Sequence, residues 1–180
     1  MNFTGTKLPG AMVIELDPKA DERGFLARTW CQNEFAARGL QTELRQCNLS
    51  FNEKKGTLRG LHYQAKPHAE AKLVTCVRGA IYDVAVDLRP DSPTFKQWLA
   101  VELTAANRRM LYIPEGLAHG FQTLEDHSEV FYYMFEFYHP ESARGVRWDD
   151  PAFEIKWPPV EKLIISAWDR NHELFRNKSF

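Results

Sequence analysis

The chain has 180 residues, which is enough for one well-buried core, and we expect a single domain over residues 1–180. With 23 basic and 24 acidic side chains its formal net charge is -1, so no overall field draws it to nucleic acid or to an anionic membrane. The N-terminus lacks a secretory signal pattern and no stretch approaches the roughly 18 apolar residues of a membrane span, so we expect a soluble, cytoplasmic protein.

Strand patterns separated by turn signals dominate the chain. Strands are predicted over residues 12–16, 43–51, 72–77, 81–88, 97–103, 109–114 and 129–138. Helical signal is confined to residues 31–40, which end on Gly39, and to a turn or two after Pro158 and Pro159. Aromatic residues make up 13% of the chain, a share that suits a sheet interior. These features predict an antiparallel β sandwich or barrel.

The three cysteines favour neither a disulfide framework nor a zinc site. Cys31, Cys47 and Cys76 are odd in number and widely spaced, and they lie in strand-like or apolar segments. A buried structural role is the ordinary one for such cysteines, and we expect it for all three.

The predicted strand 81–88 has two chemically different faces. One face carries Tyr82, Val84, Val86 and Leu88, and the other carries Ile81, Asp83, Ala85 and Asp87. We expect Asp87 to be solvated at the strand end. For Asp83 the pattern leaves open whether it faces water or a polar cavity.

Four basic or protonatable side chains occur in GTLRGLHYQAKPHAEAK (residues 56–72), where alternating apolar residues would be ordinary. His62 could act as a general base oriented by a carboxylate, and Lys72 could hold a developing negative oxygen. A tyrosine from the strand 129–138 could return the proton from another side. Spacing alone equally allows a hydrogen-bonded structural His62 and a Lys72 that protects a strand edge. His68, in the loop KPHAE, is expected to be solvated.

Other chemistries find little support in the sequence. Residues 114–119 have the Pro-x-Gly-x-x-His spacing of the second metal motif of cupins, but the first motif fails because Gln64 follows His62 at the next ligand position. Two histidines without a third ligand make a poor metal site, so no metal and no cofactor is expected. A Gly-x-Ser-x-Gly elbow, a phosphate loop and a dinucleotide fingerprint are not found.

Long strings resemble the dTDP-4-dehydrorhamnose 3,5-epimerase family: GTLRGLHYQ (56–64), residues 71–95, LYIPEGLAHGF (111–121) and residues 144–158. The resemblance implies an all-β cupin jelly roll, or double-stranded β-helix, with a few short helices and no metal. It also implies a homodimer with exchanged strands. The substrate would be a nucleotide-linked 4-keto-6-deoxyhexose, epimerised at C3 and C5. Such chemistry needs no cofactor because the C4 ketone acidifies the hydrogens on both carbons.

The family's functional residues carry over one at a time. His62 matches the general base, Asp169 its carboxylate partner, Lys72 the residue beside the substrate's O4, and Tyr132 the acid. Positions expected to contact the phosphates, the sugar or the base are Arg23, Phe25, Arg28, Gln46, Asn48, Arg59, Asp83, His119, Tyr138 and Trp168. The match therefore favours a cavity position for Asp83.

The departures from the family pattern cluster around the nucleotide. Arg28 reverses a charge, Ala143 replaces a common Glu, and Trp168 replaces a common Lys. Three alternatives therefore stay open beside the 3,5-epimerase: a single-centre epimerase of a CDP- or GDP-linked sugar, a ketoisomerase, and a non-catalytic sugar-nucleotide binding cupin. Tyr132 favours an epimerase, since a ketoisomerase tends to use a second histidine there.

Overall fold

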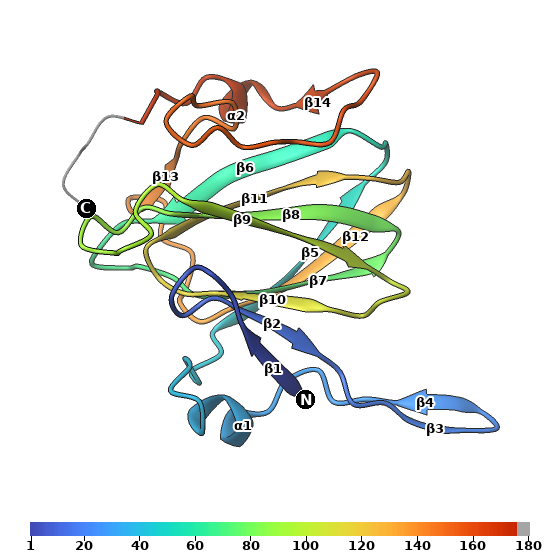
Figure 1. The fold of residues 1–180 in the computed structure, drawn as a ribbon. Helices are drawn as coiled ribbons and strands as arrows, with labels where there is room; N and C mark the ends of the chain where they lie inside the picture. Colours follow the sequence, from blue (N-terminus) through green and yellow to red (C-terminus); the bar gives the residue numbers. More distant parts are fainter. Residues whose placement is uncertain (176–180) are drawn as a thin grey trace.

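The computed structural model describes residues 1–175, which form a sandwich of two sheets (Figure 1). The first sheet has the order β1 (Asn2–Gly5), β2 (Met12–Glu15), β10 (Met110–Ile113), β7 (Lys72–Arg78), β12 (Ser128–Met134), β5 (Gln46–Asn52). The second has the order β13 (Ala143–Gly145), β6 (Thr57–Gln64), β11 (Leu117–Thr123), β8 (Ala80–Asp87), β9 (Trp98–Thr104), with β14 (Ile164–Ile165) paired to β6. A separate hairpin, β3 (Lys19–Asp21) and β4 (Gly24–Leu26), projects from the body. The helices are α1 (Gln32–Ala36) and α2 (Ala167–Arg170).

The core consists of three layers of apolar side chains. The central layer lies between the sheets and includes Val74, Leu111 and Val130, all essentially inaccessible to solvent. Phe35 of α1 covers the outside of the first sheet, and Phe153 of the C-terminal segment covers the outside of the second. The architecture is the cupin-type jelly roll that was expected, with two short helices among the described residues.

The predicted strands are largely confirmed, with differences at their ends. The strand predicted over 129–138 ends at Met134, because the chain then leaves the sheet and Phe135 donates its N–H to the carbonyl of Ala71. Among the strands of seven or more residues, the pattern missed β6 and β11, in which His62 and His119 and two glycines stand among the apolar residues. The helix predicted over 31–40 is confirmed but shorter, and Gly39 follows it with a positive φ of 67°.

The two faces of β8 are both buried, which the alternation did not reveal. Val84 and its apolar neighbours face outward under the C-terminal segment, whereas Asp83 faces the sandwich interior and is 0% exposed. The expectation of a solvated Asp87 is wrong, because the loop after β8 folds back over its carboxylate. Arg89, Ser92 and Thr94 all donate hydrogen bonds to it. Burial works to raise the pKa of Asp87, but these hydrogen bonds outweigh it and lower the pKa.

Other expectations from the sequence also need correction. Cys76 is buried and Cys31 partly so, but Cys47 is exposed because it lies on the outer face of the edge strand β5. The strand predicted over residues 12–16 forms β2, which is paired on both sides within its own chain, to β1 and to β10. His68 is only partly exposed, and its ring stacks on that of His139 with centroids 3.5 Å apart.

The strands β6 and β11 approach each other unusually closely where two glycines meet. A Cβ on Gly60 would lie 2.6 Å from the Cα of Gly120, and a Cβ on Gly120 would lie 2.7 Å from the carbonyl oxygen of Arg59. Any larger residue at either position would force the strands apart. His62 and His119 are Cα partners immediately beside this contact.

None of the helices within residues 1–175 has the length and apolar character needed to cross a membrane.

Candidate active site

Two cavities meet between the sheets. The Arg59 cavity, of about 420 Å³, is lined by Leu49, Ser50, Phe51, Arg59, His62, Lys72, His119, Gly120, Phe121 and Tyr132. The Tyr138 cavity, of about 440 Å³, is lined by Gln46, Asn48, His62, Tyr63, Gln64, Glu70, Lys72, Tyr132, Met134, Tyr138, Ala143, Arg144 and Trp168. His62, Lys72 and Tyr132 line both, so the predicted base, cation and phenol converge where the cavities join.

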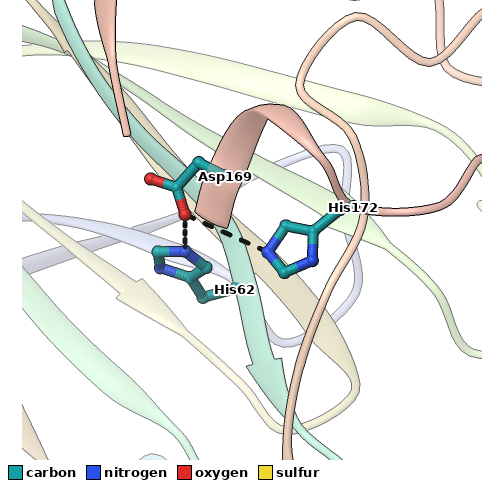
Figure 2. Close-up of side chains that lie close together, drawn as sticks. All are labelled: His62, Asp169 and His172. Carbon is teal, nitrogen blue, oxygen red and sulfur yellow. Dashed lines mark hydrogen bonds and ion pairs between the residues drawn. The ribbon is translucent and has the colours of Figure 1, made fainter. Parts of the chain in front are cut away.

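His62 is paired with a buried carboxylate from the far end of the chain (Figure 2). Nε2 of His62 lies 2.6 Å from Oδ1 of Asp169, while Oδ2 of Asp169 accepts the N–H of Gly60 at 3.3 Å. The His62 side chain is 40% exposed and the Asp169 side chain 6%. Because Nε2 is committed to Asp169, Nδ1 is the ring nitrogen left free to take a proton from a ligand.

The short helix α2 holds Asp169 in place. Ser166 is its N-cap, and its hydroxyl accepts the N–H of Asp169 at 3.0 Å. Burial works to raise the pKa of Asp169, but the hydrogen bond and charge of His62, with the N–H of Gly60, outweigh it and lower the pKa. Asp169 is therefore a carboxylate near neutral pH, suited to stabilise the imidazolium that His62 becomes on taking a proton.

Lys72 opens β7 and is 9% exposed. Its Nζ lies 2.7 Å from Oε1 of Glu70, whose side chain is 5% exposed. The other oxygen, Oε2 of Glu70, is buried and has no hydrogen-bond partner within the described residues. A buried cation is retained only with a compensating charge, so Glu70 stabilises Lys72 in the cavity wall. The sequence interpretation missed Glu70, although its position two residues before Lys72 was a usable signal.

Tyr132 faces the cavities from the middle of β12, where it pairs with Asn48 of β5 and Val74 of β7. The amide groups of Gln46 and Asn48 both contact the sulfur of Met134, at 3.5 and 3.1 Å. In each of these strands every second side chain points toward the cavities. Polar residues that are two positions apart in β5 and β12 therefore form one wall.

A second pair of histidine and aspartate lies deeper. Nε2 of His119 is 2.7 Å from Oδ1 of Asp83, and the two side chains are 10% and 0% exposed. Asp83 does not line either cavity but lies behind His119, which lines the Arg59 cavity. Asp83 thus belongs to the polar interior, and His119 is the group that a ligand can reach.

The remaining predicted residues fall into two sets. Arg59 lines its cavity and is held by Asn52, while Tyr138 and Trp168 line the Tyr138 cavity and are 59% and 67% exposed. By contrast, the second set, which consists of Arg23, Phe25 and Arg28 on or near the β3–β4 hairpin, lines neither cavity. Arg23 pairs with Asp21 and Arg28 with Glu34, whereas the ring centroid of Phe25 lies 4.5 Å from the guanidinium carbon of Arg108.

Two groups of metal-ligating side chains occur in the described part of the chain: His62, Asp169 and His172, and His68, His139 and Glu141. His172 was missed by the sequence interpretation; it lies three residues after Asp169, just beyond the end of α2. Burial and the neighbouring His62 lower the pKa of His172, against an opposing effect of Asp169, so that it is neutral near pH 7.

Comparison with known proteins supports the family resemblance. The profile of the family described as dTDP-4-dehydrorhamnose 3,5-epimerase matches residues 5–177. A dTDP-4-dehydrorhamnose 3,5-epimerase of Shigella flexneri is 44% identical over 176 residues, covering 97% of this chain and 96% of that protein.

Solved structures agree with this relationship. The dTDP-4-dehydrorhamnose 3,5-epimerase from Elizabethkingia anophelis superposes with a TM-score of 0.95 at 37% identity, covering 100% of this chain and 99% of that one. The dTDP-6-deoxy-D-glucose-3,5-epimerase from Legionella pneumophila, solved in complex with dTDP-4-keto-L-rhamnose, gives 0.91 at 37% identity, with 96% and 92% covered.

Proposed function

The chain belongs to the dTDP-4-dehydrorhamnose 3,5-epimerase family, and from this premise we propose that it inverts C3 and C5 of a dTDP-linked 4-keto-6-deoxyhexose. The main support for this proposal is that His62, Lys72 and Tyr132 lie together at the junction of the two cavities. At about 420 and 440 Å³, both cavities have the size that is usual for small-molecule sites. A non-catalytic binding protein would need no base, orienting carboxylate and acid together.

The reaction follows from the placement of these groups. Nδ1 of His62 removes the proton from the carbon beside the ketone, and Asp169 stabilises the imidazolium that results. Nζ of Lys72, held by Glu70, stabilises the enolate oxygen. Tyr132 returns a proton to the opposite face of the carbon, which inverts it. Solvent then reprotonates the tyrosinate and takes the proton from His62, so the net change is an isomerisation.

Solvent deuterium incorporation tests this function. The protein is incubated in deuterated water with dTDP-4-keto-6-deoxyglucose, and the sugar is examined by NMR. We expect label at C3 and C5 together with inversion at both carbons. Label at one carbon only would show a single-centre epimerase. CDP- and GDP-linked sugars are tested in parallel, and label in one of them instead would show that the enzyme acts on a different nucleotide. Binding without any label would refute the catalytic function.

Tyr132→Phe separates the two proton transfers. The variant lacks the phenol that returns the proton, so epimerisation should slow by about 10²-fold or more while His62 still exchanges substrate hydrogen with solvent. Equal loss of exchange and inversion in this variant would remove Tyr132 from the acid role.

We further propose a homodimer in which the β3–β4 hairpin of each protomer completes the nucleotide site of its partner. Support comes from the hairpin's projection from the body and from the exposure of its residues Phe25 (49%) and Leu26 (78%) (Figure 1). Leu49 of β5 and Val77 of β7 are also 59% and 49% exposed, and a partner subunit could cover these apolar side chains. The cytoplasmic location and the single-domain organisation stay predictions.

Subunit complementation tests the dimer. His62→Ala and Arg23→Ala are each expected to be inactive as homodimers. In a mixed dimer, one of the two sites would combine the intact His62 of the Arg23→Ala subunit with the intact hairpin of the His62→Ala subunit. Random exchange should therefore restore about a quarter of native activity. If the hairpin serves its own protomer, both sites of the mixed dimer carry a lesion and the mixture stays inactive. Light scattering gives the oligomeric state independently.

A further inference from the structure

His172 lies beside the His62–Asp169 pair without an evident role in the epimerase reaction. Its Nε2 is 4.0 Å from Oδ1 of Asp169, the same oxygen that His62 contacts, and it is not among the residues lining either cavity. Nε2 of His172 is buried and has no hydrogen-bond partner among residues 1–175. A buried nitrogen without a partner is costly, so its retention calls for an explanation.

The three side chains converge as metal ligands do. Both histidines direct Nε2 at one carboxylate oxygen, as Figure 2 shows, and the rings are nearly perpendicular, at 79°. The ligand atoms all lie within 4.8 Å of one another, so small side-chain rotations would bring them to the roughly 2.0–2.2 Å bonds of zinc. The C-terminal segment thus supplies two of the three ligands, Asp169 and His172, beside His62.

Packing holds His172 in this position. Its ring lies against Gly145 of β13, where a Cβ would lie only 2.1 Å from Nε2 of His172. Gly145 is also the Cα partner of His62. On its other side the ring meets Trp168 edge-on, with centroids 5.0 Å apart. A glycine opposite the base therefore leaves the space that the second imidazole fills.

We propose that His62, Asp169 and His172 form an inhibitory site for a divalent transition metal ion of the zinc type. The ion bonds to Nε2 of both histidines and to the Asp169 carboxylate, and its fourth position remains open to water. The Nε2 proton of His62 moves to Nδ1, so no proton is lost overall. Nδ1 is then protonated and cannot take a proton from the sugar, which inactivates the enzyme while the ion is bound.

Metal binding can be tested without substrate. The full chain, freed of metal with a chelator, is titrated with Co²⁺, whose tetrahedral complexes with nitrogen and oxygen ligands absorb strongly in the visible range. We expect this absorption for the native protein and for His139→Ala, which disrupts the other His-rich group. We expect its loss in His172→Gln. A signal retained in His172→Gln, or lost in His139→Ala alone, would overturn the proposal.

The inhibition is measured by epimerase assay and in this respect rests on the proposed function. His172→Gln should keep native activity without metal, whereas its half-inhibitory Zn²⁺ concentration should rise at least about tenfold, because even outer partners of metal ligands are worth about 10–100-fold in affinity. A chelator should restore the native enzyme. Equal inhibition of both proteins by Zn²⁺ would refute the site. A His172-dependent Co²⁺ signal in a protein without epimerase activity would refute the function and support the site.

Discussion

Residues 1–175 contain two hydrogen-bonded pairs of histidine and aspartate, and the pairs differ in exposure and in origin. In the exposed pair, His62 is 40% accessible, and Asp169 comes from α2, 107 residues away. In the buried pair, His119 and Asp83 are 10% and 0% accessible and come from the neighbouring strands β11 and β8. The same two residue types thus serve different ends. Accessibility of the imidazole to a ligand distinguishes a candidate base from a polar element of the interior.

Removal of each histidine should show the largest difference between the two pairs. His62→Ala should lower epimerase turnover and solvent exchange by about 10²–10⁴-fold, the usual value of a positioned base. His119→Ala should impair substrate binding more than turnover. Steady-state kinetics with parallel deuterium exchange measures both. Normal exchange in His62→Ala would show that the base has been assigned to the wrong pair.

The carboxylates should differ next, by a smaller factor. Asp169→Asn keeps the size of the side chain but cannot compensate an imidazolium, so turnover should fall by about 10²-fold or more. Asp83→Asn should change turnover much less, because His119 takes no proton in the proposed reaction. A comparable loss in both variants would mean that the two pairs act together in catalysis.

For the free energy of unfolding we expect the opposite order, with the larger loss on removal of the buried carboxylate. Asp83→Ala leaves Nε2 of His119 buried without its partner, which should lower the free energy of unfolding by about 1–3 kcal/mol. His62 in Asp169→Ala can turn to water, because it is far more exposed. Urea unfolding at neutral pH compares the two variants. A larger loss for Asp169→Ala would contradict the view that the buried pair serves the interior.

The smallest effect is expected in the pH dependence of folding. The folded pKa of Asp169 lies below its usual value of 3.8, so its contribution to stability is present above that value and is lost as pH falls through the folded pKa. The stability difference between native protein and Asp169→Asn should therefore shrink as pH drops below about 3.8. Asp87→Asn should behave alike, since the pKa of Asp87 is also lowered. A difference independent of pH would contradict this assignment.

Local patterns predicted much of the fold but little of how its polar groups pair. Alternation identified β8 and its two faces, yet the burial of Asp87 depends on Arg89 and the loop that follows, a contact no period expresses. Alternation likewise placed Cys47 in a strand but could not show that β5 is an edge with one face exposed.

In the candidate site, too, local patterns do not show which polar groups pair. His62 and Lys72 stood out by type and spacing, and Asp169 came only from the family resemblance, because nothing local links residues so far apart in the chain. Glu70 and His172 escaped notice because their meaning depends on side chains brought close by folding. The single chain also separates the hairpin residues from the cavities, which the sequence cannot reveal.

The position of Asp169 on α2 has a consequence for biosynthesis. Every strand of both sheets precedes it in the chain, so the ribosome synthesises all of these strands before it reaches this carboxylate. A chain that ended before Asp169 would carry His62 and all of these strands but would lack the charge that, in the proposed reaction, supports proton abstraction. Such a product should bind the nucleotide sugar and release it unchanged. In the proposed reaction, catalytic competence therefore depends on the contact that α2, the last helix of the described chain, makes with β6.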